Sequence, residues 1–118
     1  MLSISHKLFP YRFDVTKLGP VEMEITVRNL SATPKLLSYE VTFPESILVD
    51  TKGAKKGSDV FKLGEVKPDE AKVFKYKMRP VSNMRRGDQN IQIKIYEHYE
   101  NYENLESTMT KIITIRAV

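Results

Sequence analysis

Few side chains in this 118-residue sequence could do chemistry, and the two histidines come first among them. His98 follows Glu97 in the stretch YEHYE, and a carboxylate beside an imidazole is a combination used for metal binding and for acid–base catalysis. Successive side chains of an extended strand point to opposite faces, so Glu97 and His98 would not converge on one site. We therefore interpret His98 as a solvated residue near a loop, and a metal site there would also need His6.

Other reactive groups are missing or isolated. The sequence has no cysteine, which excludes thiolate nucleophiles, disulfides and Cys-ligated zinc. No serine lies in a Gly-x-Ser-x-Gly elbow or has a catalytic partner close in sequence, and Gly64 and Gly87 are too isolated to form a phosphate-binding loop. We expect no catalytic residue, no metal and no cofactor, and we predict that the chain is not an enzyme. A metal- or carbohydrate-binding module is the weakest alternative.

The net charge of +4 and the pI near 9.3 are only mildly basic. Lys75, Lys77 and Arg79 alternate along one expected strand and would form an outward stripe. An anionic partner could bind there, but the strand carrying Glu22 and Glu24 is expected beside it, which would pair opposite charges across the sheet. A nucleic-acid or anionic-surface partner is therefore a disfavoured alternative, because the other basic points lack the interleaved aromatic rings of a single-strand platform.

The most unusual segment spans residues 96–107 and reads YEH-YEN-YEN-LES. It should leave one strand, cross a turn near residues 101–104 and enter the last strand. Tyrosine offers a large contact area at low entropic cost, so one interpretation is an acidic and aromatic tip that docks on a basic partner. The other interpretation is a structural hairpin whose tyrosines lie over the end of the core. The candidate partner-binding residues are Tyr96, His98, Tyr99, Glu100, Tyr102 and Glu103, with Lys52, Lys55 and Lys56 as the basic surface that a second copy would present.

Strict alternation of apolar and polar residues predicts the elements that position these side chains. It is clear over residues 21–28, 37–43, 74–79, 91–96 and 109–116, although Lys111 interrupts the apolar face of the last segment. Weaker strands are expected over residues 4–13, where Pro10 indicates an edge or a bulge, and 60–66, and a short helical piece over 44–48. About seven short strands predict an all-β, immunoglobulin-like antiparallel β-sandwich, formed as a single domain over residues 1–118.

Three segments resemble the immunoglobulin-like modules of archaeal and bacterial proteins, of the CARDB and NPCBM-associated type. VEMEITVRNL (residues 21–30) is similar to their second strand, which alternates into an asparagine, LGEVKPDEAKVFKYKMRP (63–80) to their proline turn and following strand, and GDQNIQIKIY (87–96) to a strand entered through a glycine. The turn reads Pro68-Asp69-Glu70 where the family pattern has Pro-Gly-Glu, and the core Trp and paired Cys of antibody domains are missing. The resemblance implies a spacer, adhesion unit or interaction platform.

Taken together, these features predict a non-catalytic protein-interaction or structural module that binds a protein partner or a second copy of itself. No apolar run is long enough for a membrane helix and no signal peptide is visible, so we expect a cytoplasmic protein. If the chain is a fragment of a longer exported protein, an extracellular location is expected instead.

Overall fold

The computed structural model describes residues 1–49 and 58–118, and these consist of strands and connecting loops without a helix. The strands in chain order are β1 (Leu2–Phe9), β2 (Arg12–Phe13), β3 (Val21–Asn29), β4 (Lys35–Thr42), β5 (Ile47–Val49), β6 (Ser58–Val66), β7 (Ala71–Pro80), β8 (Gly87–His98) and β9 (Leu105–Ala117). Among the described residues we find no helix of the length and apolar character that crossing a bilayer requires.

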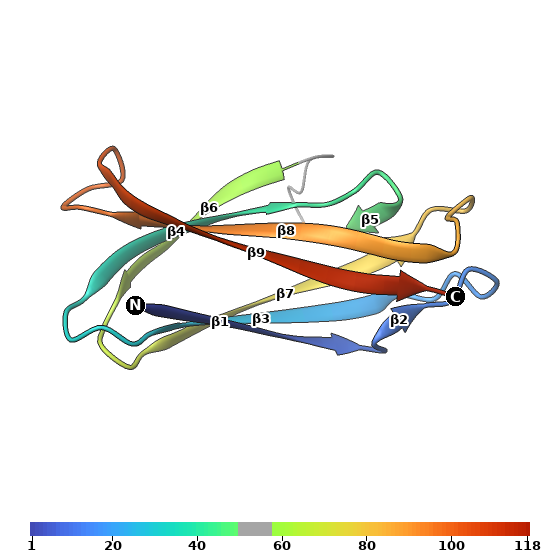
Figure 1. Ribbon diagram of the computed structural model, residues 1–118, viewed down its shortest axis with the longest axis horizontal. Coiled ribbons are helices and arrows are strands. Elements are labelled where there is room, and N and C mark those ends of the chain that lie inside the picture. The colour runs from blue at the N-terminus through green and yellow to red at the C-terminus, as the bar shows by residue number, and fades with distance from the viewer. Residues whose placement is uncertain (50–57) are drawn as a thin grey trace.

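The strands form two sheets that lie face to face (Figure 1). One sheet has the order β1-β3-β7-β5 and the other has the order β2-β9-β8-β4-β6. Neighbouring strands run antiparallel except β2, which pairs with the end of β9 in parallel. The architecture confirms the predicted all-β, immunoglobulin-like sandwich, with the first predicted strand divided into β1 and β2 and the short strand β5 added.

The core lies between the sheets and consists of the apolar positions that the alternation identifies. On β3 every second residue, from Val21 to Val27, is fully buried, and the residues between them are exposed or half-buried. Ile91, Ile93 and Ile95 of β8 are fully buried from the other sheet. Fully burying one such side chain contributes roughly 1.5–3 kcal/mol, so this repeated pattern favours a two-sheet fold over a single sheet with a wet apolar face.

Two expectations about local structure need correction. Residues 44–48 form no helical piece, because the chain turns at Pro44, whose carbonyl accepts the Ile47 N–H, and then adds β5 to the edge of β7. The expected strand over residues 4–13 is divided at a cis peptide bond before Pro10. Its first part, β1, is an edge strand of one sheet, as the proline indicated, and its second part, β2, joins the other sheet.

The basic stripe of β7 lies beside the acidic face of β3, as predicted. Lys77 is opposite Glu22, and Lys75 is opposite Glu24, with its Nζ 3.6 Å from a Glu24 carboxylate oxygen. The positive charge of this face is therefore partly neutralised within the sheet. An exposed pair of this kind contributes only about 0–1 kcal/mol to stability.

Candidate functional site

The tyrosine–glutamate segment forms the end of β8, a six-residue tip and the beginning of β9. The Tyr99 N–H donates to the carbonyl of Asn104 at 2.8 Å, which closes the hairpin over residues 99–104. Inside the tip, the Glu103 N–H donates to the Asn101 side chain at 3.0 Å, and Glu100 adopts a left-handed φ of 63°. The tip is thus a compact turn at the predicted position, held by its own hydrogen bonds.

Tyr102 attaches this tip to the far edge of its own sheet. Its hydroxyl accepts the backbone N–H of Gly64 on β6 at 2.9 Å, and its ring lies 5.1 Å from the His98 ring and 4.8 Å from Lys62 Nζ. Gly64 has a φ of +80° next to a β-bulge of β6, a conformation that glycine adopts without strain. The bulge and the tyrosine together draw the hairpin tip across β4 toward β6.

His98 lies beneath Tyr102 and is bonded to a buried serine. Its Nε2 is 2.6 Å from Ser38 Oγ, and Ser38 is only 3% exposed. The expectation of a solvated histidine therefore needs correction, because the residue is half-buried and its ring bonds to Ser38 and contacts Tyr102. Ser38 escaped the sequence analysis because it is 60 residues away.

A serine next to a histidine invites comparison with a nucleophile and its base. Nucleophilic catalysis needs an accessible hydroxyl and an imidazole that a third group orients through the other ring nitrogen. Ser38 is covered, and His98 Nδ1 is buried without a partner in the part of the chain that the structure describes. This pair is suited to fixing the hairpin and poorly suited to acyl transfer.

The other candidate residues divide between the sheet and the tip. The Tyr96 hydroxyl donates to Glu40 at 3.3 Å, and partial burial followed by the negative charge of Glu40 raises its pKa above the usual value. Tyr99, Glu100 and Glu103 are exposed on the tip. The structural interpretation of the hairpin thus applies to Tyr96, His98 and Tyr102, and the partner-binding interpretation applies to the exposed residues of the tip.

The remaining predictions concern three lysines, Glu97 and His6. Lys52, Lys55 and Lys56 lie outside the described residues. Glu97 does not converge with His98, as expected, because its carboxylate accepts the Ser107 hydroxyl at 3.0 Å whereas His98 bonds to Ser38. His6 lies on β1 in the other sheet, and no group of three or more potential metal-ligating side chains occurs within residues 1–49 and 58–118.

A groove of about 380 Å³ runs beside the hairpin. The hairpin contributes His98, Tyr99 and Glu100. The rest of the lining comes from the turn before β4 and the start of β4 (Thr33, Pro34, Lys35 and Leu36), the end of β6 (Glu65) and the start of β9 (Glu106). Three glutamates and one lysine give this lining a net charge of −2, whereas the whole chain carries +4. Sequence reasoning missed the wall formed by residues 33–36 and 65, because no local pattern links them to the hairpin.

Buried Asn29 holds one wall of the groove in place. Its side-chain amide donates to the carbonyls of Thr33 and Val66, each at 2.9 Å, and its oxygen accepts the backbone N–H and the hydroxyl of Ser31 at 2.9 and 2.6 Å. With 0% exposure, Asn29 satisfies groups that would otherwise be buried without partners. It fixes the turn after β3, and so the groove wall that this turn supplies.

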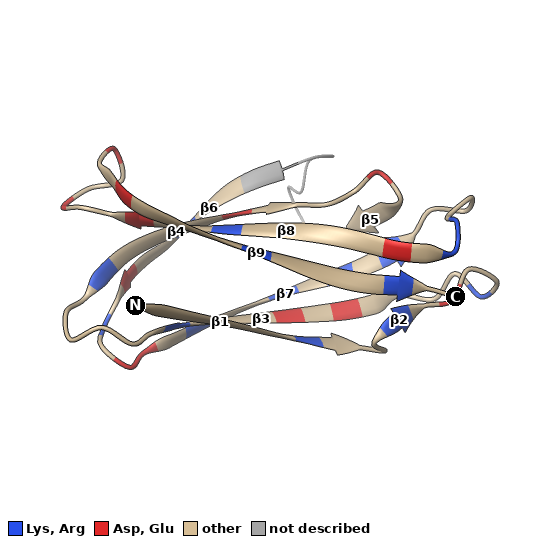
Figure 2. Cartoon of the chain, in the orientation of Figure 1, with Lys and Arg blue, Asp and Glu red and all other residues tan. Residues whose placement is uncertain are grey.

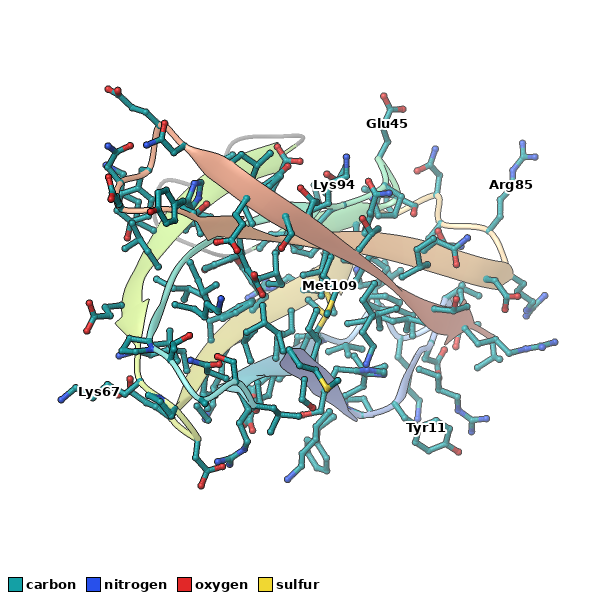
Figure 3. The ribbon with its side chains drawn as sticks, turned by 60° about the vertical axis from the view of Figure 1, so that its left-hand side comes forward. Tyr11, Glu45, Lys67, Arg85, Lys94 and Met109 are labelled. Carbon is teal, nitrogen blue, oxygen red and sulfur yellow. The ribbon has the colours of Figure 1, made fainter. Side chains whose placement is uncertain are left out.

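A second hollow, of about 480 Å³, lies at the opposite end of the sandwich. Its charged side chains, Glu45 and Arg85, extend away from the sheets (Figure 3). Its polar groups bond to one another, since the Ser46 hydroxyl donates to Gln89, whose amide donates to the Arg85 carbonyl at 3.4 Å. The groove beside the hairpin is the better candidate site, because it combines an exposed aromatic ring with unbalanced charge.

Neither a family model nor a curated protein sequence matches this chain. The solved structures that resemble it include the following three. A FixG-related protein from Vibrio parahaemolyticus is 13% identical with a TM-score of 0.57, over 98% of this chain and 95% of that one. A family 123 glycoside hydrolase from Clostridium perfringens is 10% identical with a TM-score of 0.54, over 100% of this chain. The PapD-like domain 7 of human CEP192 is 14% identical with a TM-score of 0.50, over 99% of this chain and 84% of that one.

These likenesses show a shared β-sandwich fold alone. The chain spans only 27% of the glycoside hydrolase, so nothing of that enzyme's activity follows for it. One fold carries many functions, and a function must be argued from the site.

Proposed function

We propose that this chain is a non-catalytic protein-binding module that takes a basic, extended segment of its partner in the groove beside the β8–β9 hairpin. The proposal rests on the lining of the groove, where Tyr99, which is 60% exposed, lies together with three glutamates. These are Glu65, Glu100 and Glu106. Carboxylates attract Lys and Arg side chains, and an exposed tyrosine ring offers a face for a cation.

The construction of the hairpin supports this role. Tyr102 and His98 are held against the sheet, so the tip does not have to be ordered when a partner arrives. A preorganised site loses less conformational entropy on binding. The resemblance of three segments to interaction modules agrees with this proposal and stays a prediction.

The alternatives have less support. An anionic partner on the β7 stripe would compete with Glu22 and Glu24, which already lie opposite Lys77 and Lys75. A metal-dependent module would need a set of ligands, and the described residues contain no such group.

Binding of a fluorescein-labelled peptide of alternating arginine and serine tests the proposal, with an alternating glutamate–serine peptide as the negative probe. We expect fluorescence anisotropy to rise with the basic peptide alone and to fall again as salt screens the contact. Tyr99→Ala should weaken binding roughly fivefold, corresponding to about 1 kcal/mol for an exposed cation–π contact. Glu65→Gln should weaken it as well.

Tyr11 supplies the matched control, because it is 69% exposed and extends from the sandwich well away from the hairpin (Figure 3). Tyr11→Ala should leave the affinity unchanged. The proposal fails if the two peptides bind equally, or if Tyr99→Ala and Glu65→Gln bind the basic peptide as well as the unaltered chain does.

A further inference from the structure

Strand β9 has a long free edge. It pairs with β8 along one side, but on its other side β2 reaches only Arg116 and Ala117 (Figure 1). Residues 105–115 therefore have no strand beside them on that side in the described part of the chain. The unpaired N–H and C=O groups of such an edge are a template for another strand.

The surroundings leave this edge open. The bond from Gly64 to Tyr102 draws the hairpin tip toward β6, which is the opposite edge of the same sheet. Lys111 turns toward the other sheet, where its Nζ donates to the Ile4 carbonyl of β1 at 2.9 Å. This contact occupies an acceptor on the edge of β1, so β9 offers the more complete ladder.

The geometry points to a second copy of this chain as the occupant, paired antiparallel through β9 about a two-fold axis at Ile112. The regular stretch of edge covers residues 107–115, because an irregularity at Glu106 precedes it and β2 follows it. An axis at Lys111 would place that lysine opposite its own copy, which is unfavourable. An axis at Ile112 sets this 59% exposed side chain against itself and sets Thr110 against Thr114 of the second copy.

The charges at the two ends of β9 complement each other in this arrangement. Acidic residues gather at the hairpin end, and Arg12 and Arg116 lie side by side at the other end (Figure 2). The paired stretch then runs from residue 109 to residue 115, because β2 occupies the edge beside Arg116. Glu106 of one copy lies just outside this stretch, on the side of Arg116 of the other. Both side chains are exposed, and neither forms an ion pair with any described residue. This match favours a second copy over an unrelated strand, and it does not depend on peptide binding in the groove.

Single cysteine variants test the register directly, since the chain has no cysteine of its own. Directly opposite residues of an antiparallel pair have Cα atoms about 4.5–5.5 Å apart, within the range of a disulfide. Ile112→Cys should therefore form a covalent dimer in a glutathione redox buffer, and a mixture of Thr110→Cys with Thr114→Cys should form a mixed one. Thr108→Cys is the control, because its two copies would be about 26 Å apart at the rise of a strand.

Sedimentation tests the association without a cross-link. We expect the unaltered chain to dimerise at about 300 µM, a high concentration that suits a small interface. Ile112→Lys should make it monomeric, whereas Val73→Lys, a matched change at a 53% exposed position on β7, should not. Circular dichroism confirms that both variants are folded. A chain that stays monomeric, or Ile112→Cys that cross-links no faster than Thr108→Cys, overturns the proposal and leaves Lys111 as a guard of an edge that remains unpaired.

Discussion

Replacing Tyr102 with phenylalanine separates the structural part of the hairpin from its exposed part. The change deletes one hydroxyl, the acceptor of the Gly64 N–H at 2.9 Å, and keeps the ring between His98 and Lys62. A buried donor without a partner costs about 1–3 kcal/mol, and because this bond is only partly buried we expect a loss near 1 kcal/mol. For a chain of this size that corresponds to about 4 °C in Tm.

Tyr102→Ala also removes the ring. The cation–π contact with Lys62 contributes about 0.5–1 kcal/mol and the edge contact with His98 about 0.5–1.5 kcal/mol, so the total loss should exceed about 2 kcal/mol. Urea unfolding followed by circular dichroism measures both variants.

The matched control is Tyr99→Phe, the same chemical change on a 60% exposed side chain of the same tip. It should leave the free energy of unfolding unchanged, because the Tyr99 hydroxyl has no hydrogen-bond partner among the described residues. If Tyr102→Phe unfolds at the same urea concentration as the unaltered chain, or if Tyr99→Phe proves equally destabilising, Tyr102 does not anchor the hairpin.

Two further predictions concern stability. Asn29→Ala removes four hydrogen bonds of a fully buried side chain and should cost about 3 kcal/mol or more, whereas Asn90→Ala on the exposed face of β8 should cost less than about 0.5 kcal/mol in the same urea assay. Desolvation, and then the charge of Lys111, lower the pKa of His6. The folded chain therefore prefers the neutral imidazole, so this contribution to stability is complete above the unfolded pKa of about 6.5 and is lost as the pH falls through the lower folded pKa. Between pH 8 and pH 5 the urea midpoint of unfolding should fall by less in His6→Gln than in the unaltered chain. An equal fall in the two would contradict the role of His6.

Much of the fold could be predicted because alternation is a local property of the chain. A strand with one apolar face must bury it, and several such strands can do so together only in two facing sheets. The immunoglobulin-like arrangement predicted that the strand with Lys75, Lys77 and Arg79 would lie beside the strand with Glu22 and Glu24, and β7 does pair with β3. Asn29 in the segment VEMEITVRNL was visible as part of a family pattern, but its three hydrogen bonds to the turn and its bond to the Val66 carbonyl of β6 were not.

Local patterns failed where pairing between distant segments decided the outcome. Residues 44–48 carried a weak helical preference, and the ladder between β5 and β7 outweighed it. His98 looked like a solvated side chain because its partner Ser38 lies 60 residues away in the sequence.

By itself, then, the sequence determined the long strands, the sandwich and the acidic, aromatic character of the hairpin, because these depend on the identity and spacing of neighbouring residues. Only the tertiary structure decided which tyrosine anchors the hairpin and which one is exposed. Tyr102 meets Gly64 across 38 residues of chain, and the groove joins the hairpin to the turn before β4 and to the end of β6. Such contacts follow from how the strands pair and how the β-bulge bends the edge of the sheet, and no short-range pattern encodes them.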